Sequence, residues 1–68
     1  MTKHLLESKP VLGSNGKLRV VMCRVDKRLG PEFVTWIWDT RYDLQRGCSC
    51  GHYFQHKHEA EQDFDRRN

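Results

Sequence analysis

The chain has 68 residues and a formal net charge of +3, with 37% hydrophobic and 31% charged side chains. A chain of this length forms one domain with a small core and a thin margin of stability. The aromatic content argues against disorder, and no run approaches the ~18 apolar residues that span a bilayer, so we expect no membrane partner. Residues 1–7 lack the apolar core of a secretion signal. We therefore expect a cytoplasmic protein with reduced cysteines.

The N-terminal residues are weakly patterned. Pro10 argues against a continuous helix, and the Gly-Ser-Asn-Gly sequence at residues 13–16 is typical of a turn, because Gly and Asn tolerate positive φ angles. We expect residues 1–16 to form an extended arm with at most a short edge strand. Residues 17–68 are expected to form a single β-β-β-α domain.

Residues 17–26 and 33–39 predict two long strands joined by a hairpin, with a Gly-Pro turn signal at residues 30–31. In the first strand, alternation places on one face Leu18, Val20 and Met22. In the second strand, where β-branched and aromatic residues dominate, one face carries Val34, Trp36 and Trp38. Residues 48–54 favour a third strand, which Gly51 weakens or bulges.

A C-terminal helix is predicted from about residue 55 to residue 67. Its sequence contains good helix formers and no breaker, and Ala60 and Phe64 lie four residues apart on one face. The order of elements favours an α+β fold, in which a small antiparallel sheet, a meander of about three strands, carries one C-terminal α-helix on one face.

A surplus of apolar sheet surface leads to the main functional prediction. The expected helix offers only Ala60 and Phe64 as apolar groups, which cover part of one sheet face. The residues that we expect to remain exposed and to bind a protein are Val20, Met22, Trp36 and Trp38. Tryptophan is enriched at interface hot spots, so we predict a non-catalytic protein-binding module whose partner is another protein or a second copy in a homodimer. In the alternative, residues 1–12 fold back and cover the tryptophans.

A basic strand edge gives a second hypothesis, nucleic-acid binding. Cations beside exposed aromatic rings bind single strands through phosphate contacts and base stacking. The candidate residues are Arg19, Arg24, Lys27, Arg28 and Arg41. The acidic C-terminal helix would repel phosphate from its own side, and charges at strand ends also protect a sheet edge from aggregation.

A cluster of cysteine and histidine residues gives a third hypothesis, a structural zinc site. The candidate ligands are Cys48, Cys50, His52 and His56. A single residue separates the two cysteines, whereas structural zinc sites usually space them by two to four. Solvated histidines and small buried thiols explain the same residues, so the expected cofactor is none. No catalytic signature accompanies these side chains, and we expect a protein that is not an enzyme.

The C-terminal pattern combines an aromatic strand end with an acidic helix. Its residues are Gly51, His52, Tyr53 and Phe54, then Glu59, Ala60, Glu61, Asp63, Phe64 and Arg67. This pattern resembles the tail of many small uncharacterised bacterial and phage proteins. The resemblance covers residues 51–67 and implies no activity. Together with the small size of the chain, it leads us to expect that the protein-binding module is a regulator or inhibitor encoded by a bacterium or its phage.

Overall fold

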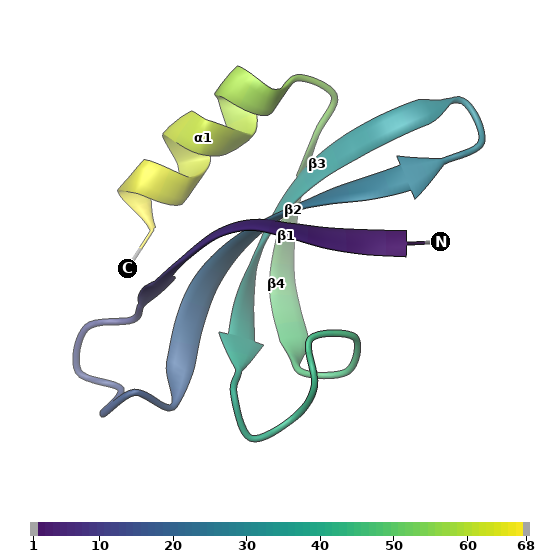
Figure 1. Cartoon of the computed structure of the whole chain (residues 1–68). Coiled ribbons are helices and arrows are strands. Elements are labelled where there is room, and N and C mark those ends of the chain that lie inside the picture. Colours follow the sequence, from purple (N-terminus) through teal and green to yellow (C-terminus); the bar gives the residue numbers. More distant parts are fainter. Residues whose placement is uncertain (1, 68) are drawn as a thin grey trace.

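Four antiparallel strands and one C-terminal helix form two layers in the computed structural model, which describes residues 2–67 (Figure 1). The elements are β1 (Thr2–Pro10), β2 (Leu18–Lys27), β3 (Gly30–Asp39), β4 (Cys48–Phe54) and α1 (Lys57–Arg66). The strands follow one another across the sheet in sequence order. The predicted α+β class, an antiparallel meander with a C-terminal helix packed on it, is confirmed.

The N-terminal segment, expected to be an arm, contains a full edge strand. β1 pairs with β2 from Thr2 to Pro10, so the sheet has one strand more than the predicted meander. A β-bulge between Leu5 and Glu7 makes Leu6 an extra residue and interrupts the alternation of polarity that identifies a strand in sequence. The pairing also satisfies backbone groups of β2 that would otherwise form an exposed edge.

The register between β2 and β3 decides which side chains lie beneath α1. Val20 pairs with Ile37 and Met22 pairs with Thr35, so these side chains point to one face of the sheet. The buried cluster under the helix consists of Val20, Met22, Ala60 and Phe64. Partly buried hydrophobic side chains surround this cluster: Leu6, Val11, Phe33, Ile37 and Phe54.

Val20 and Met22 are separated from the tryptophans, contrary to the expectation that all four residues share one exposed surface. Trp36 pairs with Val21, whose side chain points away from α1, and Trp38 follows the same alternation. Val20 and Met22 are buried in the core beneath the helix, so neither contributes to an accessible face.

A polar network fixes the C-terminal end of α1 to the sheet. The buried hydroxyl of Thr35 donates to Asp63 Oδ2 at 2.5 Å, and His52 Nδ1 lies 2.9 Å from the same oxygen. Arg67 donates to the carbonyl oxygens of Thr35 at 3.1 Å and Cys50 at 2.8 Å. Burial raises the pKa of Asp63, but the hydrogen bonds from Thr35 and His52 and the charges of His52 and Arg67 outweigh it. The pKa of Asp63 therefore lies below its ordinary value of 3.8.

The lowered pKa of Asp63 predicts a loss of stability in acid. A carboxyl group whose pKa is lower in the folded state than in the unfolded state stabilises the fold at pH values above its unfolded-state pKa. This stabilisation is lost as the pH falls below about 4. We expect the free energy of unfolding to decline less steeply in acid for Asp63→Asn than for wild type, as measured by urea unfolding over a pH series. Asp65→Asn removes an exposed carboxylate from the same helix and serves as control. Identical acid declines for wild type and Asp63→Asn would contradict the assigned role.

Candidate protein-binding face

The sheet face opposite α1 is here called the open face. Strand alternation places on it Val21, Cys23 and Val25 from β2, Val34, Trp36 and Trp38 from β3, and Tyr53 from β4. The loop between β3 and β4, residues 40–47, folds onto part of this face. Trp38 Nε1 donates to the Tyr42 carbonyl oxygen at 2.9 Å, and Lys3 Nζ donates to the Leu44 carbonyl oxygen at 3.1 Å. This loop helps to explain how a face without a helix has fully buried residues.

Each indole on the open face packs against a glycine. A Cβ atom at Gly51 would lie 2.7 Å from Trp36 Nε1, and a Cβ atom at Gly47 would lie 2.8 Å from Trp38 Cδ1. A β-bulge opposite Trp36 brings Gly51 into place, and Cys50 within it has a φ of 55°. Trp36 covers Gly51 in β4, and Trp38 covers Gly47, the residue before β4. Because these glycines have no side chains, the indoles lie close to the backbone and are only partly exposed.

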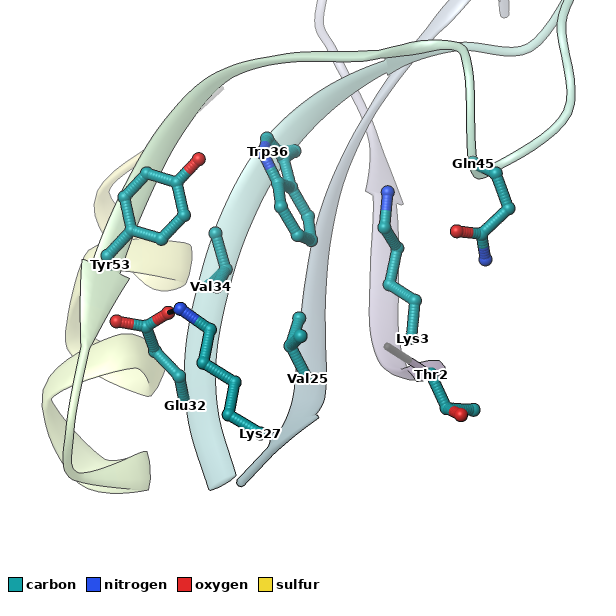
Figure 2. Close-up of a pocket in the computed structure, with 9 residues that line it drawn as sticks. All are labelled: Thr2, Lys3, Val25, Lys27, Glu32, Val34, Trp36, Gln45 and Tyr53. Atoms are coloured by element: carbon teal, nitrogen blue, oxygen red, sulfur yellow. Dashed lines mark ion pairs between the residues drawn. The ribbon is translucent and has the colours of Figure 1, made fainter. Parts of the chain in front are cut away.

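A hollow of about 440 Å³ lies on the open face beside Trp36 (Figure 2). The residues that line it are Thr2, Lys3, Val25, Lys27, Glu32, Val34, Trp36, Gln45 and Tyr53. Val25 and Val34 form its floor, and Trp36 and Tyr53 form an aromatic wall, with ring centroids 6.2 Å apart and planes at 87°. Lys3 and Gln45 lie on the opposite side of Trp36 from Tyr53, so the hollow has an aromatic side and a polar side.

Two lysines and one glutamate give the hollow an excess of positive charge. Lys3 Nζ lies 4.3 Å from the centroid of the Trp36 ring, which is a cation–π contact. Lys27 Nζ lies 2.5 Å from Glu32 Oε1, at the other end of the hollow. Among residues 2–67 this buried oxygen has no hydrogen-bond partner of good geometry, so the ion pair is what offsets its burial. Lys27 thus has Glu32 as its carboxylate partner, whereas Lys3 forms no ion pair with a carboxylate among residues 2–67.

Part of the predicted protein-binding set lies on the open face. Trp36 lines the hollow, and Trp38 lies on the same face against Gly47. The N-terminal residues form β1 at the edge of the sheet, where Leu6 packs beneath α1, Leu5 is 47% exposed and Lys3 contacts the Trp36 ring. The hollow also contains four residues that were not predicted as site residues: Lys3, Glu32, Gln45 and Tyr53. For Tyr53, the alternation within residues 48–54 was an available signal, since Tyr53 pairs with Val34.

The basic residues predicted to line a strand edge are dispersed. Three of them form ion pairs with carboxylates: Arg24 with Asp26, Lys27 with Glu32 and Arg41 with Asp39. Hydrogen bonds from Arg41 lower the pKa of Asp39 to about 2. Arg19 donates to Ser8, and Arg28 lies in the turn between β2 and β3. Because acids neutralise much of this set, its arrangement gives no support to a phosphate-binding edge.

The residues predicted as zinc ligands are not brought together. Cys48 lies on the open face, Cys50 in the β4 bulge, His52 against Asp63 on the helix side and His56 just before α1. His56 stacks on His58, with ring centroids 5.7 Å apart. Residues 2–67 contain no group of three or more His, Cys, Asp or Glu side chains arranged to hold a metal ion.

The thiols and the His52 network have the geometry of structural groups. Burial raises the pKa of Cys23 to about 11 and also raises the pKa of Cys48, so both are protonated at neutral pH, whereas the thiolate is the nucleophile. The Thr35 hydroxyl donates to the Asp63 carboxylate and is fully buried, so it is not accessible from solvent. The network therefore holds α1 on the sheet.

No family model, curated protein or solved structure matches this chain. Within residues 2–67, no helix combines the length and apolar character needed to cross a bilayer.

The contact between Trp36 and Gly51 predicts a strong energetic coupling. Gly51→Ala should destabilise the fold by about 1–3 kcal/mol, because the added methyl group overlaps the indole and the core has little room to adjust. In a Trp36→Val background, the same substitution should cost less than about 1 kcal/mol, since the obstructing ring is gone. Urea unfolding of the four proteins in this double-mutant cycle measures the coupling. An equal cost in both backgrounds would show that the indole does not require glycine here.

Proposed function

We propose that this protein is a non-catalytic module that binds a segment of another protein in the hollow of the open face. The observation that carries the proposal is the combination, in one concave site, of an apolar floor, a Trp–Tyr wall and polar groups at the rim (Figure 2). Protein interfaces have the same anatomy, with aromatic anchors at the centre and polar groups around them.

The size and accessibility of the hollow suit a partner side chain. Its volume of about 440 Å³ is at the lower end of the range for small-ligand pockets, and it is open to solvent. Tyr53 is 61% exposed, although an aromatic ring of this size gains much from burial. A partner residue that packs between Tyr53 and the valine floor would remove this apolar surface from water.

The distribution of charge favours a protein over a nucleic acid. Non-specific single-strand binding requires a basic groove that follows several phosphates along the backbone. Around this hollow, Lys27 is paired with Glu32, and Arg24 and Arg41 are paired with acids elsewhere. Lys3 alone does not provide such a groove.

Two tyrosines of similar exposure allow a matched test. Tyr53 borders the hollow and is 61% exposed, whereas Tyr42 lies in the β3–β4 loop outside the lining and is 56% exposed. We expect a photo-crosslinking phenylalanine analogue at residue 53, in cells that naturally encode the protein, to give discrete adducts that resist nuclease and are digested by protease. The same analogue at residue 42 should give several-fold less of these adducts.

Two results would contradict the proposal. Adducts that disappear on nuclease treatment would favour the nucleic-acid hypothesis, because the captured molecule would then be a strand of DNA or RNA. Equal labelling from residues 42 and 53 would indicate random collisions, with no preferred binding site at the hollow.

A further inference from the structure

The ammonium group of Lys3 lines the hollow without pairing with a carboxylate of residues 2–67. Its ammonium group contacts the Trp36 ring at 4.3 Å and donates to the neutral carbonyl oxygen of Leu44 at 3.1 Å. Among residues 2–67, the ion pairs that involve carboxylates do not include Lys3. The other lysine of the hollow, Lys27, already has Glu32 as its partner. Of the two lysines that line the hollow, Lys3 is therefore the one without a carboxylate partner within residues 2–67.

Binding of a segment in the hollow would remove solvent from the ammonium group of Lys3. A buried charge is costly unless it is paired and hydrogen-bonded, and neither an aromatic face nor a neutral carbonyl oxygen replaces a carboxylate. The partner can avoid this cost by bringing a carboxylate to the polar side of the hollow, where Lys3 and Gln45 lie on the opposite side of Trp36 from Tyr53 (Figure 2). The bond from an ammonium group to a carboxylate adds the attraction of two opposite charges, which the bond from Lys3 to the neutral Leu44 carbonyl oxygen lacks.

We infer, on the basis of the proposed function, that the partner is a protein segment with an aromatic or aliphatic anchor and an adjacent Asp or Glu. The anchor packs over Val25 and Val34 against Trp36, and the carboxylate pairs with Lys3. The two parts of this motif correspond to the two sides of the hollow. Only the side chain of Lys3 has to move, since its backbone is held in β1 opposite Val25.

The charge of the hollow argues against a second copy as the occupant. A two-fold dimer through this face would bring the same patch of each subunit together. Each patch contains Lys3, Lys27 and Glu32, so a positive excess would meet a positive excess across the interface. Like charges in such a contact are destabilising, whereas an acidic segment is complementary.

Selection from a library of random linear peptides tests this inference. We expect peptides enriched on the wild-type protein to carry Asp or Glu next to Trp, Phe or Leu, and to compete with one another. Lys3→Glu should weaken their binding at least about tenfold, which corresponds to about 1.4 kcal/mol. Selection on Lys3→Glu should in turn favour Lys or Arg beside the anchor. Lys57→Glu makes the same change of charge on an exposed residue of α1 and should keep the wild-type preference.

The outcomes separate this inference from the proposed function. Peptides that are lost with Tyr53→Ser but show no acidic preference, or no response to Lys3→Glu, would overturn the inference and leave the hollow as a binding site. Failure to enrich any peptide that depends on Tyr53 would count against both. A wild-type dimer in sedimentation that Tyr53→Ser dissociates would replace the acidic segment with a second copy. If Lys3→Glu does not fold, Lys3→Gln removes the charge and should still reduce binding several-fold.

Discussion

The pairing of β2 with β3 is the constraint on which the rest of this structure depends. These strands face each other from Leu18 opposite Asp39 to Lys27 opposite Gly30 without a bulge. Because side chains alternate along a strand, a slip of one residue would send Val20 and Met22 to the open face and Val21 and Cys23 beneath the helix. The small core under α1 would then lose both of its residues from β2. The register thus specifies both the core and the surface that remains for a partner.

A single short helix covers one face of this sheet, and the other face is covered by different means. The indoles of Trp36 and Trp38 pack on the backbone at Gly51 and Gly47, and the loop over residues 40–47 folds back onto the same face. Large rings thereby take the place of a second layer of secondary structure. The arrangement leaves a local hollow beside Trp36 in place of a fully exposed apolar face. A fully exposed apolar face would be prone to aggregation.

The parts of the structure that follow from periodicity could be read from the sequence, and the parts that depend on irregular backbone could not. The alternation in β2 and β3 and the spacing of Ala60 and Phe64 predict the two strands and the helix. β1 was missed because its bulge at Leu6 interrupts the pattern. The role of Gly51 was read only as a weakness of β4, since nothing local indicates that an indole from β3 will occupy the space of its missing side chain.

The candidate site shows the same division. Trp36 was identified because its residue type and strand position are both visible in the sequence. Lys3 and Gln45 reach the hollow from the edge strand and from a loop, and their approach depends on long-range pairing and loop closure. Val20 was included because the sequence does not state the register between β2 and β3, and that register places Val20 opposite Ile37, on the other face from Trp36.

The position of Thr2 at the rim of the hollow has a practical consequence. Polypeptide fused ahead of β1 would leave the domain beside the open face and compete with ligands there. The C-terminal end of α1 lies on the other side of the sheet, where Arg67 contacts the buried Thr35. Affinity handles, fluorophores and surface-immobilisation chemistry are therefore better attached after the helix, where they leave the hollow unobstructed.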